Sequence, residues 1–238
     1  MNNQRETSII QSGIVLECKQ IAAHTFQLKV QSNDFAKMQY VAGFTVDIFI
    51  GNPFNDPNCE HRKYSFWNYE PVYHIADFAI CTFSNGKGAE WIQKLQQGDI
   101  IFFKPPQGKL LVDNSAENYL LIGDITSLSH LYEINRNLAV SKKVFSFIYA
   151  AQELDIFQDI DKSFPFIHHI IPSNSADLIV DKIINHLPKN LTDTIAYIFG
   201  HPETCIQLHN YLKHDRNIPV QNLRTKPFWK TTREKISS

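Results

Sequence analysis

The sequence lacks the broad features that would assign a function class at once. Its 238 residues carry 23 basic and 24 acidic side chains, and the net charge of −1 gives no overall attraction to nucleic acid or to a membrane surface. No run approaches the roughly 18 apolar residues that cross a bilayer. The first residues lead into no apolar segment of signal-peptide length. We therefore expect a cytoplasmic protein with no membrane span.

Short metal-binding and nucleophile motifs are absent as well. No two of the four cysteines lie within four residues of each other, which excludes a local CxxC pair, and we expect reduced thiols. His168 and His169 are consecutive in a predicted strand and point to opposite faces, so they cannot bind one metal ion together. The sequence contains no HExxH, GxSxG or GxGxxG pattern. We predict neither a metal site nor a catalytic triad.

Short strands separated by turn residues fill the first half of the chain. Turn clusters such as Ser84-Asn85-Gly86 and Gln97-Gly98-Asp99 divide the apolar runs. Strands are expected at 13–20, 25–31, 45–50, 76–83 and 99–104, and a helix is expected to follow Gly86 and to end at Gly98. Several short strands at this spacing are typical of an all-β barrel, closed or nearly closed.

Strand–helix alternation begins near residues 113–118. Buried-type strands are predicted at 119–122, 144–150, 166–171 and 195–199, and apolar residues at helical spacing follow the first, third and fourth of them. Such alternation predicts a parallel sheet with helical crossover connections. The sequence therefore predicts two domains, at residues 1–114 and 115–238.

The segment Arg62-Lys63-Tyr64-Ser65 is the clearest candidate site. In a strand Arg62 and Tyr64 share one face, where a guanidinium can bind a phosphate and an aromatic ring can pack on a flat ring system. The segment Gly86-Lys87-Gly88-Ala89 precedes the predicted helix, and its backbone N–H groups can hold a pyrophosphate. Taken alone, the first segment is also compatible with a solvated strand end, and the second with a plain turn.

Two further turns connect predicted strands to helices in the second half. They are Gly123-Asp124-Ile125-Thr126-Ser127 and Gly200-His201-Pro202-Glu203. Ligands of open α/β folds bind at the carboxyl edge of the sheet, where such turns meet. Both are candidate nucleotide-binding turns, with a purely structural turn as the alternative.

In their order and spacing these motifs resemble the ferredoxin–NADP reductase superfamily, and most closely its siderophore-interacting, FAD-binding family. The matching segments span nearly the whole chain and also include Tyr40-Val41-Ala42-Gly43-Phe44, Asp77-Phe78-Ala79-Ile80, Pro106-Gln107-Gly108 and Phe228-Trp229-Lys230. The resemblance implies a Greek-key FAD-binding β-barrel over 1–114 and an α/β parallel-sheet, NAD(P)-binding domain over 115–238. It further implies a flavin-dependent oxidoreductase that passes electrons from NADPH or NADH through FAD to an acceptor.

The resemblance also implies roles for individual residues. Arg62 would contact the FAD pyrophosphate, Tyr64 would stack on the isoalloxazine, and Ser65 would hydrogen-bond near its N5, which makes Tyr64 and Ser65 the candidate catalytic residues. The other implied FAD-binding residues are Cys81, Thr82, Phe83, Lys87, Gly88 and Ala89. The residues implied for the nicotinamide nucleotide are Gly123, Asp124, Thr126, Ser127, Gly200, His201 and Glu203. Lys226, Trp229 and Lys230 are the candidates for binding the acceptor.

The sequence departs from the family pattern at several positions. Many siderophore-interacting proteins have Thr-Pro-Arg after the tyrosine, where this chain has Ser65-Phe66-Trp67. Reductases of the wider superfamily often have an arginine after the second strand of the nucleotide domain, and residues 149–153 contain none. Because a 2′-phosphate needs a positive partner, the sequence leaves the choice between NADPH and NADH open.

Local charge bears on the identity of the acceptor. Residues 213–238 hold seven Lys or Arg and two acidic residues, a net of +5. A cationic surface attracts an anionic ferric siderophore or an acidic electron-carrier protein. The leading hypothesis is an NAD(P)H-dependent reductase of a ferric siderophore or a similar ferric chelate. The alternatives are a flavodoxin or ferredoxin reductase, and a non-catalytic flavin-binding module.

Overall fold

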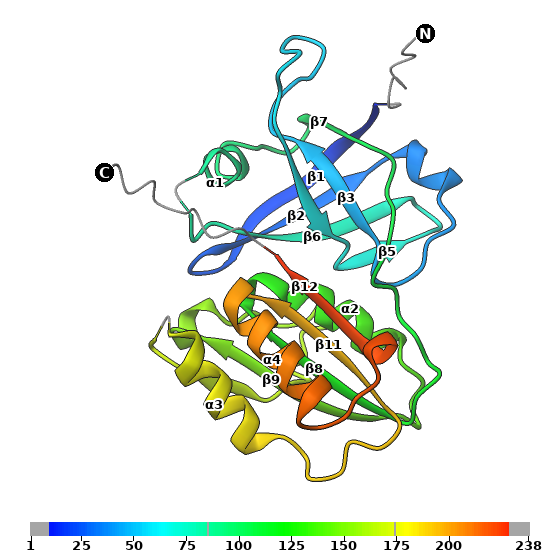
Figure 1. Ribbon diagram of the computed structural model, residues 1–238. Coiled ribbons are helices and arrows are strands. Elements are labelled where there is room, and N and C mark those ends of the chain that lie inside the picture. The colour runs from blue at the N-terminus through cyan, green and yellow to red at the C-terminus, as the bar shows by residue number, and fades with distance from the viewer. Residues whose placement is uncertain (1–9, 85, 174, 229–238) are drawn as a thin grey trace, which may run out of the picture. The chain divides into compact units, whose positions relative to one another are not determined.

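The computed structural model describes residues 10–84, 86–173 and 175–228. The chain divides into two compact units, Met1–Val112 and Asp113–Ser238, each with its own β-sheet (Figure 1). The sheet of the first unit is antiparallel, and the sheet of the second is parallel. The fold class predicted from the sequence, a β-barrel unit followed by an α/β unit, is therefore confirmed.

Within the described part of the first unit, seven strands form one curled sheet in the order β4-β3-β7-β1-β2-β6-β5. Curling turns one face of this sheet inward as a half-barrel, and the inner face carries the core. Large side chains there are almost fully buried, among them Leu28, Phe66, Phe78 and Phe103. The strands are β1 Gln11–Ala22, β2 Thr25–Gln31, β3 Thr45–Phe49, β4 His61–Ser65, β5 Asn68–Glu70, β6 Ile75–Cys81 and β7 Ile100–Phe103.

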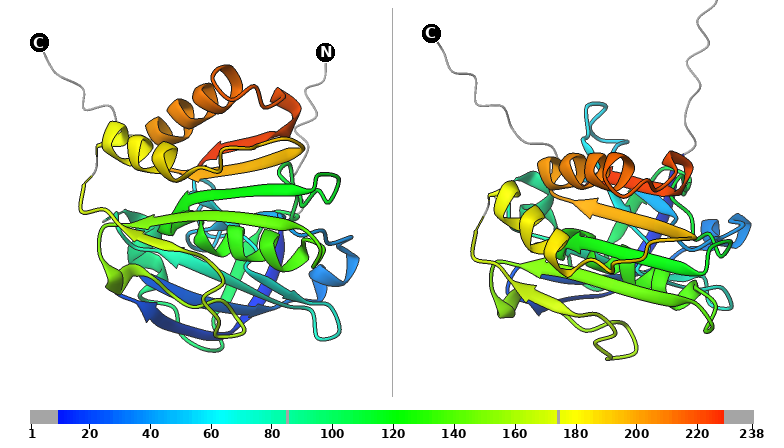
Figure 2. Two further views of the ribbon diagram at one scale, coloured as in Figure 1. Left: turned by 90° about the horizontal axis from the view of Figure 1, so that it is seen from below. Right: turned by 60° about the horizontal axis from the view of Figure 1, so that its bottom comes forward.

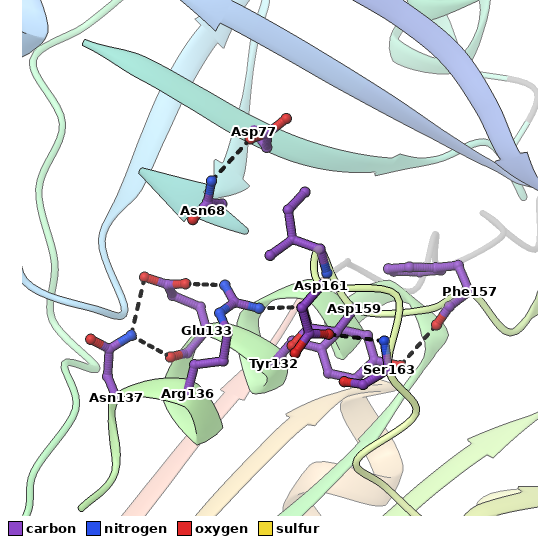
Figure 3. A network of polar contacts seen from close by, with 11 residues as sticks. Asn68, Asp77, Tyr132, Glu133, Arg136, Asn137, Phe157, Asp159, Asp161 and Ser163 are labelled. Atoms are coloured by element: carbon purple, nitrogen blue, oxygen red, sulfur yellow. Dashed lines mark hydrogen bonds and ion pairs between the residues drawn. The ribbon is translucent and has the colours of Figure 1, made fainter. Parts of the chain in front are cut away.

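One carboxylate of the first unit lies among these apolar side chains. Asp77 on β6 is 2% exposed, and it accepts a hydrogen bond from Gln27 at 2.8 Å. It accepts a second from Asn68 at 3.2 Å (Figure 3). A buried carboxylate needs such donors because burial removes its water. The two amides therefore connect β2, β6 and β5 through side chains as well as through the backbone.

The helix of the first unit, α1 Lys87–Ile92, is shorter than predicted. The sequence predicts that it ends at Gly98, but its last residue is Ile92. The following segment bonds to β1 instead: the Gly98 N–H donates to the Val15 carbonyl at 2.8 Å, and the Val15 N–H donates to the Asp99 carbonyl at 2.9 Å. These tertiary hydrogen bonds replace the helical ones. The local sequence does not reveal them, because their partner Val15 is distant in the chain.

In the described part of the second unit, five parallel strands form a sheet in the order β10-β9-β8-β11-β12. Helices α3 and α4 cover one face of this sheet and α2 covers the other (Figure 2). The C-terminal strand β12 was not predicted. The elements are β8 Asn118–Asp124, α2 Leu128–Asn137, β9 Lys143–Ala150, β10 His168–Ile170, α3 Ala176–His186, β11 Thr194–Gly200, α4 Pro202–His214 and β12 Leu223–Pro227.

A buried charge cluster fixes α2 to the connection between β9 and β10. Arg136 forms ion pairs with Glu133 on the same helix and with Asp159 on the connection (Figure 3). The side chains of Glu133 and Asp159 are only 4% and 1% exposed, and that of Arg136 is 22% exposed. Burial disfavours the charge on Arg136, but the bonds to Asp159 and Glu133 outweigh it and raise the pKa of the guanidinium. One cation thus holds two buried carboxylates.

Candidate functional site

Strand β4 and the start of α1 come together in the first unit, although Tyr64 and Gly88 are 24 positions apart in the sequence. A Cβ atom placed on Gly88 would lie 3.1 Å from the Tyr64 hydroxyl oxygen and 3.7 Å from Arg62 Cγ. Glycine therefore lets this loop approach the Arg62 and Tyr64 side chains closely. The structure brings the two strongest candidate segments of the sequence into one place.

Tyr64 and Ser65 are the less exposed members of this group. The Tyr64 ring packs against the barrel core, and burial raises the pKa of its hydroxyl far above the ordinary value, so the phenol stays neutral. Ser65 is 8% exposed. Strand β4 thus offers a neutral aromatic ring and, at the next position, a largely buried hydroxyl.

Arg62 and Lys87 share one carboxylate. Glu60 accepts from Arg62 Nη2 at 2.7 Å and from Lys87 Nζ at 2.6 Å. All three side chains are more than a third exposed. Sequence reasoning selected Arg62 and Lys87 but missed Glu60, whose position directly before the strand was the available signal.

The end of β6 places Cys81, Thr82 and Phe83 next to the turn between β1 and β2. Cys81 Sγ lies 3.6 Å from Thr25 Oγ1, and the Thr82 N–H donates to the His24 carbonyl at 2.8 Å. The Phe83 ring is 47% exposed and lies 4.8 Å from the His24 ring. Phe83 is the member of this segment that presents an open aromatic surface.

The first turn of α1 offers less for a phosphate than the sequence predicts. The Ala89 and Glu90 N–H groups both donate to the Gly86 carbonyl, at 2.8 and 3.1 Å, so they close the turn themselves. The helix has only six residues, and its positive end is correspondingly weak. Side-chain cations, rather than the helix end, are the stronger anion-binding groups here.

In the second unit, the carboxyl ends of β8 and β11 meet through two glycines. A Cβ atom on Gly200, whose φ is +111°, would lie 2.4 Å from Asp124 Oδ2. A Cβ atom on Gly123 would lie 2.2 Å from Ser127 Oγ. Both turns therefore require glycine, because any side chain would collide with a neighbouring polar group.

Side chains of these turns hold one another in place. The Asp124 carboxylate accepts from the Thr126 N–H at 2.9 Å, and the Ser127 hydroxyl donates to the Asp124 carbonyl at 2.8 Å. His201 begins α4, where its Nδ1 accepts from the Thr204 N–H at 3.4 Å. Glu203 lies exposed in the first turn of this helix. The structure thus gathers the predicted residues of both turns at one edge of the sheet.

Tyr149 at the end of β9 belongs to the same edge and was missed. Its Cα pairs with that of Asp124, and its side chain is 6% exposed. Burial, followed by the Asp124 charge, raises the pKa of the Tyr149 hydroxyl well above its ordinary value. The signal was available, because a polar residue at the end of a parallel strand lies where such folds bind ligands.

The acceptor-binding candidates lie only partly within the described residues. Lys226 is on β12, with its Nζ 5.7 Å from the centre of the Phe228 ring. Trp229 and Lys230 lie outside the described residues. Because the Cα of Gly200 pairs with that of Pro227, β12 brings Lys226 to the carboxyl edge of the sheet.

The described ranges contain no cluster of three or more His, Cys, Asp or Glu side chains that could hold a metal ion. The His169 ring instead stacks on Phe147, with 3.7 Å between ring centres. None of the helices in the described ranges is long and apolar enough to cross a membrane.

The architecture defines a class of proteins, those with a ferredoxin reductase-like fold. Phthalate dioxygenase reductase, for example, is 14% identical with a TM-score of 0.73, over 94% of this chain and 69% of that one. The siderophore-interacting protein from Acinetobacter baumannii is 11% identical with a TM-score of 0.80, over 97% and 93% of the two chains. SipS from Aeromonas hydrophila is 13% identical with a TM-score of 0.78, over 93% and 92%.

A sequence comparison relates the second unit to one family of this class. Residues 116–232 match the family model described as siderophore-interacting protein. The resemblance that the sequence motifs indicate is therefore confirmed, by the family match in the second unit and by the fold of the whole chain. No curated protein sequence matches this one.

Proposed function

We propose that the protein is a flavin-dependent oxidoreductase that passes electrons from NADPH or NADH through FAD to a ferric siderophore or a similar ferric chelate. One observation carries the proposal: Gly88 approaches Tyr64 and Arg62 so closely that a phosphate-binding cation and a neutral aromatic ring meet in one place. The match of residues 116–232 to the siderophore-interacting protein family supports the choice of acceptor.

The residues of the first unit fit FAD in charge and in side-chain chemistry. The Tyr64 ring, whose hydroxyl lies close to Gly88, could pack on a flat ring system. Arg62 and Lys87 would bind the pyrophosphate, and the hydroxyl of Ser65 would donate a hydrogen bond near flavin N5. When bound, the flavin supplies the chemistry of accepting a hydride from a nicotinamide and passing electrons onward. The protein would bind and orient the flavin and exclude water from it.

The carboxyl edge of the second sheet would hold the nicotinamide nucleotide. Gly123 and Gly200 let the Ser127 and Asp124 side chains approach the backbone there, and the Asp124 carboxylate and Thr126 hydroxyl could bond to ribose or amide groups. His201 and Glu203, at the start of α4, are the remaining polar groups of the proposed site. Lys226 would attract an anionic chelate or an acidic carrier protein.

Anaerobic reduction of the purified protein tests this proposal. After reconstitution with FAD, the protein should show flavin absorbance that bleaches on addition of NADH or NADPH and returns on addition of ferric citrate. Arg62→Ala should lose bound flavin, whereas Lys63→Ala, the adjacent exposed cation that pairs with Asp47, should retain it. Failure to bind any flavin would overturn the proposal. Reoxidation by flavodoxin but not by the ferric chelate would favour a protein acceptor instead, and binding without bleaching would favour a non-catalytic module.

A further inference from the structure

Glu60 forms ion pairs with both anion-binding side chains of the proposed flavin site, Arg62 and Lys87. Its Oε1 accepts from Lys87 Nζ at 2.6 Å and its Oε2 accepts from Arg62 Nη2 at 2.7 Å. A carboxylate that bridges a guanidinium and an ammonium uses the same donors that a phosphate would use. A bound phosphate and the Glu60 carboxylate therefore compete for the same two cations.

The backbone at Glu60 is held, so only its side chain is free to move. The Glu60 carbonyl accepts from the Ile50 N–H at 2.8 Å, which closes the base of the connection between β3 and β4. This connection projects beyond the sheet (Figure 1), and within it the Cys59 N–H donates to the Asp56 carbonyl at 3.0 Å. Release of the cations thus needs rotation of one side chain that is 39% exposed, without refolding of the connection.

We propose that Glu60 is an internal competitor for phosphate, which occupies the donors of Arg62 and Lys87 in the ligand-free protein and sets the affinity of the site for phosphate-bearing flavins. This inference rests on the proposed function for the identity of the flavin. A diphosphate carries two charges against one on the carboxylate, so FAD displaces Glu60 but binds less tightly than the two cations alone would allow. A flavin without phosphate never meets this competition.

The amide variant Glu60→Gln separates charge from size. It keeps the side-chain volume but removes the negative charge, both from the two cations and from the neighbourhood of the incoming phosphates. Exposed ion pairs are individually weak, so the two pairs together with the lost repulsion should tighten phosphate binding about tenfold, or about 1.4 kcal/mol. Glu90→Gln is the matched control, because Glu90 is an exposed carboxylate on α1 that pairs only loosely with Lys94, at 3.9 Å.

Calorimetric titration of the full chain with FAD, riboflavin and inorganic pyrophosphate tests the inference. Glu60→Gln should bind FAD and pyrophosphate about tenfold more tightly than the wild type and riboflavin equally well, and Glu90→Gln should match the wild type with all three. The gain should vanish in the double variant Arg62→Ala/Glu60→Gln.

The three ligands also separate the two proposals. If wild type and Glu60→Gln bind FAD and pyrophosphate with equal affinity, or if the variant binds them more weakly, Glu60 is no competitor while the flavin function stands. If Glu60→Gln tightens pyrophosphate binding but neither protein binds a flavin, the competitor role stands and the flavin function fails. If neither protein binds pyrophosphate or a flavin, both proposals fail.

Discussion

The substitution Arg136→Met tests the buried charge cluster of the second unit. It removes the one cation shared by Glu133 and Asp159, whose side chains are 4% and 1% exposed, while keeping an unbranched apolar stem in place. Removal of one partner from a buried ion pair costs about 3–5 kcal/mol, because the remaining charge stays buried and unpaired. Arg136 is itself 22% exposed, so we expect the lower end, about 3 kcal/mol, at pH 8. Such a loss is a large part of a domain stability of roughly 5–15 kcal/mol.

Urea unfolding followed by circular dichroism at the helical band suits this test, because α2, α3 and α4 all lie in the second unit. Arg224→Met is the matched control: Arg224 pairs with Asp113 at 3.0 Å, but both side chains are about 30% exposed, and we expect a loss of less than about 1 kcal/mol. The two variants stand in the same unit and lose the same charge. Equal losses in both would refute the reasoning that burial makes the Arg136 pairs strong.

The pH dependence of the variant gives a second, independent reading. Without Arg136, the carboxylates of Glu133 and Asp159 are buried and uncompensated, so their folded pKa values should rise above the unfolded ones. A raised folded pKa contributes stability that is present at low pH and lost as pH rises through the folded value. The deficit of Arg136→Met relative to the wild type should therefore shrink between pH 8 and pH 5. A deficit that grows on acidification would contradict the account.

Four further outcomes are expected. Arg62→Ala should weaken FAD binding at least about tenfold in a fluorescence titration. Because the Arg62 side chain is exposed, the variant should change the free energy of unfolding by less than about 0.5 kcal/mol. Unchanged FAD affinity would show that Arg62 is not part of the site. Gly200→Ala should cost about 2 kcal/mol or more, because the new Cβ meets the Asp124 carboxylate, whereas Gly98→Ala, with φ of +93° and nothing within 4 Å, should cost only about 1 kcal/mol. Thermal melts that rank the two variants the other way would contradict this. Residues 144–161 contain four acidic residues and no Lys or Arg, so the 2′-phosphate of NADPH would have no cationic partner after β9. The ratio kcat/KM should therefore favour NADH over NADPH at least about tenfold, and a preference for NADPH would refute the argument. Burial and then the His169 charge lower the pKa of His168, so the unfolded state binds the proton more readily than the folded state, and the free energy of unfolding should fall as pH drops below about 6.5. In urea titrations at pH 7.5 and 5.5, His168→Gln should reduce this pH-dependent loss of stability. An unchanged pH dependence would exclude this histidine as the cause.

Apolar periodicity predicted most of the fold, because it is a property of neighbouring residues. The strand at Thr25–Gln31 was predicted with its observed bounds, and the parallel strands of the second unit were found from their buried runs. Strand β12 was missed because Leu223–Pro227 contains polar residues and has no apolar run. The segment forms a strand because it pairs with β11. The premature end of α1 has the same origin, since Val15 supplies the bonds that replace its last turns.

The residues of the candidate site likewise fall into those that local sequence predicts and those that it does not. Arg62, Gly88 and Asp124 could be selected because their residue types and local turns carry a chemical meaning by themselves. For Glu60 and Tyr149 the sequence offered only a position at the end of a strand as a signal. Their importance arises from neighbours distant in the sequence, such as Lys87 for Glu60 and Asp124 for Tyr149, which only the folded chain brings near. Residue type predicts what a side chain can do, and tertiary structure decides what it meets.

The two edges of the parallel sheet have a consequence for the behaviour of the protein in concentrated solution. A sheet edge exposes unpaired N–H and C=O groups that can join a strand from another molecule. Here the central strands β8 and β11 each have seven residues, but the edge strands are β10, with three, and β12, with five, the last of which is Pro227. A proline cannot donate to an incoming strand, and three residues provide too little length for stable pairing. The apolar interior of this sheet is thereby protected from edge-to-edge aggregation.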